Sequence, residues 1–593
     1  MTRFRQSRHG GRRSDRGAVA VALLMILAIS LIGPVRAATR SAGGPGARKS
    51  IRSWVSCDGR TDDAAGLAAA FAAAAHDAFT LVVDCPVRFA VGKDIGKTVF
   101  IEDDTSVEFS GAGKITVDNL FHPAFTLANV KNIVLTNWNV EYDGSLPVDH
   151  NIGGFEQNGR FVASAGTAQP AGAFNDKQLT PWLAAKKAIT FDRSQGSVNS
   201  LWPGPTNVCA IFYVSGDTSN LKVDGMHVAV PPNAGAERFV PVLFSFQPNF
   251  KQNQTVTAKT AYSVQSMAVP HGMSFSNIIL DGTYMGWVGN IQDATFENIQ
   301  SHRYADLQDE NGGHVGGNGK WFAPPHLMYF SYNANGDPGL FNRNIRIKNV
   351  VDDGPRVGTA RDKGGTDSLS GYALSLKLGC VDCSVDGYRT NRPDGFMDVL
   401  ASDGLTVSNV DATFDSSFLN DVFPGWRFPS PPYKRVTFKN ITLKDMASVS
   451  DRAPIGDATQ ASNEGIVMQN VQVTLNRWTG KGLPVPNITG PGNHVVIDYL
   501  ISSDSSRLQS VQTGSGMLTL LANPAIVAAP SETRLSWAAK GADACVATRD
   551  WQGSFGPNGS QAVPMGHAGH YTLGVSCQTQ GEPLAAAVDL TAH

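Results

Sequence analysis

Charged residues are scarce in this 593-residue chain, where Asp, Glu, Lys and Arg make up 17% of the sequence. The chain also has no basic excess, because 49 Lys and Arg stand against 51 Asp and Glu. Coiled coils and disordered regions are much richer in charge, and a nucleic-acid-binding protein needs a basic surface. The composition therefore argues against these classes, and we expect no nucleic-acid partner.

Long apolar runs are missing after residue 33. The run from Ala18 to Gly33 is shorter than the roughly 20 residues that a membrane-spanning helix needs. Six arginines precede it and small residues follow it at Val35-Arg36-Ala37, which is the pattern of a secretory signal. We predict a signal peptide, no membrane span after its removal, and a secreted or periplasmic protein. The Arg12-Arg13 pair leaves a twin-arginine export route open.

Removal of this signal changes the charge of the chain. Residues 1–37 carry seven Arg and one Asp, so the net charge would change from −2 to −8. An acidic protein repels a polyanionic glycan unless local basic groups or bridging cations intervene.

Cysteine is also sparse, with seven residues, and this number fits an oxidising compartment. A metal site of the zinc-ribbon type would need a second CxxC motif, which is missing. We expect a local disulfide or two stacked thiols at Cys380 and Cys383, and a buried thiol at Cys209. The predicted disulfides are Cys57–Cys85, Cys380–Cys383 and Cys545–Cys577.

An internal repeat is present between Tyr372 and Asp415. Each half has a short run of alternating apolar residues, a turn of small or polar residues and a second alternating run. Alternation predicts strands. A unit of roughly 20 residues is too short for a βαβ crossover, which needs about 30, and fits one coil of a β-solenoid.

Similar alternating runs recur along the chain, most of them after an Asn. We expect these Asn residues to adopt left-handed geometry and to stack into ladders. The runs begin at Asn132, Asn220, Asn277, Asn344, Arg435 and Val495. Companion strands are expected at Ala210–Val214, Val242–Phe246, Met285–Val288 and Leu327–Tyr332.

A capping helix is predicted before the first coils. Asp62 and Asp63 are N-cap candidates, and the Ala-rich run after them places Leu67, Ala70, Phe71 and Ala74 on one face. The opening Asp58-Gly59-Arg60-Thr61-Asp62-Asp63 and this helix resemble the start of the pectin lyase-like superfamily, which includes polygalacturonase- and rhamnogalacturonase-related proteins. The resemblance covers roughly residues 55–500. It implies an all-β fold, a right-handed parallel β-helix with an N-terminal capping helix.

The motifs of polygalacturonases are only partly present. The chain has no Asn-Thr-Asp, its nearest Gly-His is Gly313-His314-Val315, and Arg346-Ile347-Lys348 lies in an ordinary Asn-initiated run. The resemblance therefore implies the fold and assigns no pectin-hydrolysing residues.

The chain after residue 498 changes character. Trp537 lies eight residues before Cys545, and Tyr571 lies six residues before Cys577. Antibody domains place this Tyr two residues before the Cys, so the segment resembles a bacterial immunoglobulin-like β-sandwich, expected as a spacer or end-cap, or alternatively as a glycan-binding domain. The predicted domains are a signal peptide (1–37), a polar leader (38–54), a β-helix (55–498), a linker (499–517) and a sandwich (518–593).

Long segments between the runs predict insertion loops, where binding and catalysis usually lie. These segments are residues 145–207, 302–325 and 352–371, and Asp352-Asp353 is expected to form a turn. Neighbouring coils lie about 4.8 Å apart, so we expect Lys377 and Asp398 side by side and pointing outward.

Glycoside hydrolysis needs two carboxyl groups, whereas elimination from a uronate needs a base and a charge that stabilises the enolate. Clustered Asp residues in a lyase would hold Ca²⁺; a hydrolase needs no cofactor. The candidate catalytic residues are Asp398, Asp309, Glu310, Lys377 and His314. The candidate substrate-binding residues are Arg303, Asp306, Lys320, Trp321, His326 and Trp287.

The sequence thus predicts a secreted, monomeric enzyme that acts on a polysaccharide, with a glycoside hydrolase favoured over a lyase. A non-catalytic surface protein that binds glycan is the alternative. Two carboxylates roughly 5–9.5 Å apart in one groove would favour the enzyme.

Overall fold

The computed structural model describes much of the chain from residue 46 onward. The described residues are 46–92, 97–118, 120, 123–143, 148–149, 154–157, 160–163, 169–170, 210–230, 242–247, 269–282, 285–302, 326–330, 342–354, 373–376, 380–392, 395–399, 401–416, 426–427 and 432–593. The predicted signal peptide, Cys209 and most of the predicted insertions lie outside them. In the described part, no helix is long and apolar enough to cross a membrane.

The predicted capping helix is present as α1 (Ala64–Asp77). Asp62 accepts a hydrogen bond from the backbone N–H of Ala64 at 3.1 Å, which satisfies one of the free donors of the first turn. The predicted apolar face is buried against the first coils, where Phe71 lies 5.8 Å from the ring of Phe125. The helix ends at Asp77, and the C-cap residue after it, Ala78, has left-handed backbone geometry.

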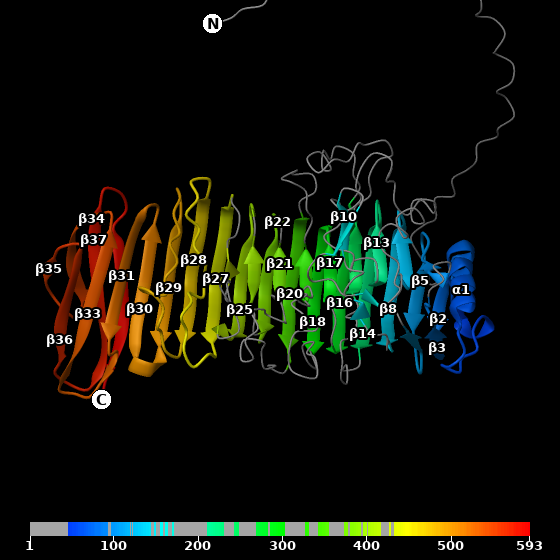
Figure 1. Ribbon diagram of the computed structural model, residues 1–593, viewed down its shortest axis with the longest axis horizontal. Helices are drawn as coiled ribbons and strands as arrows, with labels where there is room; N and C mark the ends of the chain where they lie inside the picture. The colour runs from blue at the N-terminus through cyan, green and yellow to red at the C-terminus, as the bar shows by residue number, and fades with distance from the viewer. Residues whose placement is uncertain are drawn as a thin grey trace, which may run out of the picture. The chain divides into compact units, whose positions relative to one another are not determined.

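The β-helix is built from two parallel sheets, and most coils contribute a short strand to one and a long strand to the other. In Figure 1 the strands of successive coils lie side by side from β2 (Thr80–Val83) next to α1 as far as β29 (His494–Ile501). The short strands include β7 (Phe125–Ala128), β13 (Ala210–Ser215), β15 (Val242–Gln247), β17 (Met285–Gly289), β19 (Met328–Phe330), β21 (Leu374–Leu376), β24 (Met397–Val399) and β26 (Trp426–Arg427). The long strands include β8 (Lys131–Tyr142), β14 (Ser219–Val230), β16 (His271–Gly282), β18 (Gln292–His302), β20 (Asn342–Asp353), β23 (Ser384–Thr390), β25 (Thr406–Phe414), β27 (Lys434–Asp445) and β28 (Glu464–Leu475).

The predicted repeat forms two consecutive coils. β21 pairs in parallel with β24, and β23 pairs in parallel with β25. The chain is therefore a right-handed parallel β-helix with an N-terminal capping helix, as the sequence predicted.

The Asn residues form two ladders, which confirms a second prediction. One ladder precedes the long strands or lies at their start, and Asn132 and Asn220 in it have φ values of 61° and 55°. The other divides most long strands into two halves, as at Asn440 in β27, with φ 55°. Asn440 donates a hydrogen bond to Asn409 at 3.0 Å and accepts one from Asn470 at 3.0 Å. The left-handed residue turns the strand, and its amide joins neighbouring coils.

We expect the backbone geometry of this ladder to outweigh its hydrogen bonds. The N440A variant should lower the free energy of unfolding by about 1–2 kcal/mol, because alanine is strained in left-handed geometry. The N440G variant should lose less, because glycine adopts this geometry freely. Chemical denaturation followed by circular dichroism measures both values. A glycine variant as unstable as the alanine variant would contradict this explanation.

The core of the coils contains a column of stacked aromatic rings. The rings of Phe212 and Phe244 are stacked 4.7 Å apart, and Trp287 follows Phe244 at 6.2 Å. Trp287 is fully buried. Its predicted role in stacking on a sugar is therefore wrong, because the core covers both faces of its ring.

The segment predicted as a linker is a pair of strands instead. β30 (Ser506–Thr513) pairs antiparallel with β29 of the last coil, and β31 (Gly516–Asn523) pairs with β30. The polar side chains that suggested a linker are partly buried, and Gln512 bonds to the backbone of Pro486 and Ile488. The long-strand sheet thus continues directly into the C-terminal segment.

The C-terminal segment contains two sheets that share one hydrophobic cluster. β33 (Ser531–Lys540) and β36 (Asn558–Met565) extend the sheet that contains β31. The second sheet consists of β32 (Ile526–Val527), β38 (Leu584–Ala592), β37 (Gly569–Thr579), β34 (Ala542–Arg549) and β35 (Ser554–Phe555). The immunoglobulin-like identity of this segment stays a prediction.

All three predicted disulfides are present: Cys57–Cys85, Cys380–Cys383 and Cys545–Cys577. Cys545 and Cys577 are direct neighbours on β34 and β37 of one sheet. The disulfide of antibody domains instead links two sheets, so this segment departs from that pattern.

Candidate functional site

Most predicted site residues lie outside the described part of the chain. They are Arg303, Asp306, Asp309, Glu310, His314, Lys320, Trp321 and Lys377. Their roles stay predictions, and the described candidates are Asp398, Trp287 and His326.

Asp398 lies at the centre of β24 and is fully buried. Its register partner on the preceding coil is Ser375. The prediction that Lys377 stands beside Asp398 is therefore wrong, because Ser375 occupies that position on the preceding coil. Ser375 and Asp398 continue a row that contains Tyr329 on β19.

His326 is largely buried, with 6% of its surface exposed, and its ring is stacked on Tyr329 at 4.7 Å. Its predicted contact with substrate stays a prediction.

A groove crosses four successive long strands, β18, β20, β23 and β25, on the half of each strand that follows the second ladder. Its volume is about 610 Å³. One wall carries the ladder positions Asn298, Asn349, Gly387 and Asn409. The outward residues beyond that wall are Gln300, Val351, Arg389 and Asp411, which share one row of the sheet register.

A second row of polar residues lies two positions farther along β18 and β20 and continues onto the preceding strand, β16. Asp281, His302 and Asp353 are register partners on three successive coils. The Asp353 carboxylate lies 2.7 Å from Nδ1 of His302, and Asp281 lies 2.7 Å from Nε2 of His227. We call Asp281, His302 and Asp353 the rim row. Its three side chains retain 22%, 43% and 42% exposure.

The spacing of the rim row follows from the sheet. Coils in register lie about 4.8 Å apart, so the backbones at Asp281 and Asp353 are about 9.6 Å apart with His302 between them. The bond to Asp353 orients the imidazole of His302. The row thus has two carboxylates and an oriented histidine beside a groove.

A buried ion pair lies beneath the rim row. Asp352 and Arg392 are almost completely buried and bonded to each other. Ser301 donates a hydrogen bond to Asp352 at 2.9 Å. Since Ser301 precedes His302 and Asp352 precedes Asp353, this network anchors the strand ends that present the rim row. The predicted turn at Asp352-Asp353 is wrong, because both residues end β20.

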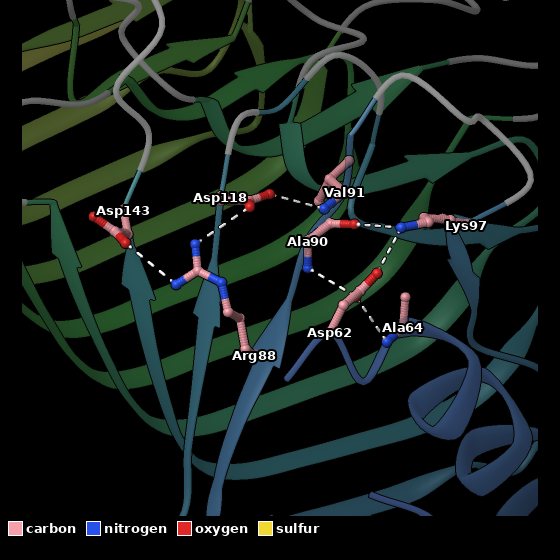
Figure 2. A network of polar contacts seen from close by, with 8 residues as sticks. All are labelled: Asp62, Ala64, Arg88, Ala90, Val91, Lys97, Asp118 and Asp143. Carbon is pink, nitrogen blue, oxygen red and sulfur yellow. Dashed lines mark hydrogen bonds and ion pairs between the residues drawn. The ribbon is translucent and has the colours of Figure 1, made fainter. Parts of the chain in front are cut away.

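A second polar network joins the capping helix to the first coils (Figure 2). Arg88, on β3 (Pro86–Phe89), lies 3.4 Å from both Asp118 and Asp143. Lys97 contacts Asp62 at 2.6 Å. Burial raises the pKa of Asp118, and the neighbouring Asp62 and Asp143 add to this effect, while the N–H of Val91 and Arg88 oppose it. Because Asp62 also binds the first turn of α1, this network ties the cap to the β-helix.

The raised pKa of Asp118 predicts the pH dependence of a variant. The folded state binds the proton more tightly than the unfolded state, so this group favours folding at low pH, and that contribution is lost as the pH rises through the folded pKa. The asparagine of D118N does not titrate, so the variant does not lose stability in this way. The melting temperature of D118N minus that of the wild type should therefore increase as the pH rises from 3.5 to 7. D543N, at an exposed carboxylate without a described partner, is the control. A D118N difference that stays constant with pH would contradict the prediction.

Sequence reasoning missed the rim row, although a signal was present. Asp281, His302 and Asp353 each lie near the end of an alternating run, immediately before an irregular segment. Such positions lie at the ends of strands, where side chains from neighbouring coils come together.

Comparisons with known proteins give distant similarities. No family model and no curated protein matches the chain. A polygalacturonase from Erwinia carotovora ssp. carotovora is similar at 11% identity with a TM-score of 0.34, over 69% of this chain and 89% of that one.

Two further solved structures are similar at this level. The gp42 tailspike of Acinetobacter phage vb_AbaP_AS12 has 10% identity and a TM-score of 0.33, over 88% of this chain and 82% of that one. Pantoea stewartii WceF, a glycan biofilm modifying enzyme, has 8% identity and a TM-score of 0.20, over 90% of this chain and 68% of that one. The β-helix assignment itself rests on the strand pairing described above.

Proposed function

We propose that the protein is a secreted polysaccharide-degrading enzyme, and specifically a glycoside hydrolase. The observation that carries the proposal is the rim row, which presents two carboxylates on either side of His302 beside a groove. The spacing of about 9.6 Å between their backbones is close to the range of about 6.5–9.5 Å that separates the carboxyl groups of inverting hydrolases.

The proposed mechanism assigns one role to each end of the row. One carboxyl group protonates the oxygen of the leaving sugar, and the other activates a water molecule on the opposite face of the ring. Asp353 is one of these two carboxyl groups. Its hydrogen bond to His302 stabilises the charge that forms when a proton is transferred. Asp281 is the second carboxyl group, and His227 holds it in place.

Asp398 remains a second proposal for the catalytic carboxylate. A fully buried carboxylate is costly, and functional sites often retain such groups. Residues Asp309, Glu310, His314 and Lys377 keep their predicted catalytic roles as part of this second proposal.

The experiment is an assay of the purified full-length chain on a panel of polysaccharides, with two readouts. New reducing ends without absorbance from unsaturated uronate would support a hydrolase. Unsaturated product would indicate a lyase, and retention of glycan without cleavage would indicate a binding protein; both results would contradict the proposal. D398N and D353N in the same assay separate the two proposed sites.

The proposal includes a secreted or periplasmic location, which the three disulfides support because such bonds persist in oxidising compartments. It also includes a monomeric state, which sedimentation velocity of the purified protein tests.

A further inference from the structure

The outward face around the groove has an excess of negative charge. On the second halves of β16, β18, β20, β23 and β25, the described outward side chains include the carboxylates Asp281, Asp353 and Asp411. The one guanidinium or ammonium group among them is Arg389. With neutral histidine, these five half-strands have a net charge of −2, and the exposed Lys444 on the flanking β27 (Lys434–Asp445) brings the face to −1. A polyanionic chain in the groove would meet electrostatic repulsion.

Arg389 and Asp411 are register neighbours on adjacent coils, and both are exposed. Neither forms an ion pair or hydrogen bond with another described residue. A guanidinium donates up to five hydrogen bonds, and a carboxylate accepts several. The two groups therefore present donors and acceptors side by side. The hydroxyls of an uncharged sugar match them, because each hydroxyl both donates and accepts hydrogen bonds.

Apolar side chains occupy the same row of the register on both sides of Gln300. Val351 is half-buried, and Ile279 keeps 41% exposure, which is unusual for an isoleucine on a sheet face. From Ile279 to Arg389, the row therefore alternates apolar and hydrogen-bonding groups along the stack of coils. Sugar rings have the same character, with apolar C–H faces and polar rims.

Gly387 widens the groove at its centre. It replaces Asn in the ladder between Asn349 and Asn409, and a Cβ atom there would lie 3.1 Å from Oδ1 of Asn349. The glycine thus leaves a space between the side chains of Asn349 and Asn409, which an asparagine at position 387 would fill.

We propose that this groove binds a neutral polysaccharide, with its chain running along the stack of coils and its hydroxyls bonded to Arg389 and Asp411. The inference deepens the proposed hydrolase function and rests on it for the position of the scissile bond. It also favours hydrolysis over elimination, because elimination requires the carboxylate of a uronate substrate.

The test is affinity electrophoresis of the full-length protein in native gels that contain one polysaccharide each. The neutral probes are dextran, galactomannan and xyloglucan, and the anionic probes are polygalacturonate, alginate and hyaluronate. The variants are R389Q and D411N, each compared with a control of the same charge change, R343Q or E532Q, at exposed positions away from the groove. All are measured in the wild-type and D353N backgrounds, and each mobility is referred to a gel without polysaccharide.

We expect at least one neutral probe to retard the protein, equally at low and high salt, because screening affects only charged ligands. R389Q or D411N should weaken this retardation about tenfold, the effect of losing one hydrogen bond to a charged group, and the controls should not. Retardation by anionic probes alone, by no probe, or to the same degree in all variants would overturn the inference. Neutral retardation without cleavage by the wild type would contradict the hydrolase and leave this inference standing. Cleavage of a polyanion alone would support the hydrolase and overturn this inference.

Discussion

Replacing Asp353 by asparagine is expected to lower the rate of polysaccharide cleavage by about 10²–10⁴-fold, the usual contribution of a general acid or base. Asparagine keeps the size and a hydrogen-bonding oxygen, so the contact with His302 is retained in part while proton transfer is lost. The effect should fall on kcat, because Asp353 lies outside the residues that line the groove. Initial rates on the most active glycan of the panel measure it.

Two further variants make this result specific. D281N should cause a loss of the same order, because both carboxyl groups are needed in the same step, one as the acid and the other as the base. D543N, at an exposed carboxylate of the C-terminal segment, is the control with the same change of charge, and it should leave the rate unchanged. Full activity of D353N and D281N, combined with loss of activity in D398N, would place the chemistry on the short-strand sheet.

The D352A variant is expected to lower the free energy of unfolding by about 3–5 kcal/mol, because it removes a charged partner from the buried guanidinium of Arg392. Asp352 and Arg392 have side-chain exposures of 0% and 1%, so water compensates for little of this loss. Guanidinium denaturation followed by tryptophan fluorescence measures the change.

A double variant separates the charge from the packing. In D352L/R392M both charges are replaced by apolar groups of similar size, and such replacements are often neutral or stabilising. The D353A variant, at the exposed neighbouring position, should change stability by no more than about 0.5 kcal/mol. A loss below about 1 kcal/mol in D352A would show that the pair contributes little, and equal losses in D352A and the double variant would show that packing dominates.

The sequence predicted the elements whose signals are local. The buried face of α1 follows from helical spacing at Leu67, Ala70, Phe71 and Ala74, and the ladders follow from Asn at the starts of alternating runs. Such patterns depend on neighbours in the chain, so no knowledge of other coils is needed.

Register between coils could not be read in the same way. Lys377 and Asp398 occupy similar points in the two repeats, yet the coils align Ser375 with Asp398, 23 residues apart, and Ser384 with Thr406, 22 residues apart. The offset between the repeats is therefore not constant. The rim row shows the same difficulty. Asp281 precedes His302 by 21 residues, while Asp353 follows it by 51, and insertions of unequal length hide the alignment that the sheet creates.

The predicted linker failed for a different reason. Ser, Gly and Gln between residues 499 and 517 suggested a flexible connection, but Ser510 and Gln512 are buried. For Gln512, the backbone groups of Pro486 and Ile488 on the neighbouring coil supply the hydrogen bonds that a buried polar side chain needs.

The direct pairing of β29 with β30 has a practical consequence for expression and proteolysis. A fragment that stops after the last coil would leave one side of β29 with free backbone N–H and C=O groups, ready to recruit a second chain. The antiparallel strand β30 thus covers the last coil of the stack, as α1 covers the first coils. Any soluble fragment for crystallisation has to keep at least β30 and β31, and a nick between Ser502 and Ser505 is the cut most apt to convert the molecule into a self-associating one.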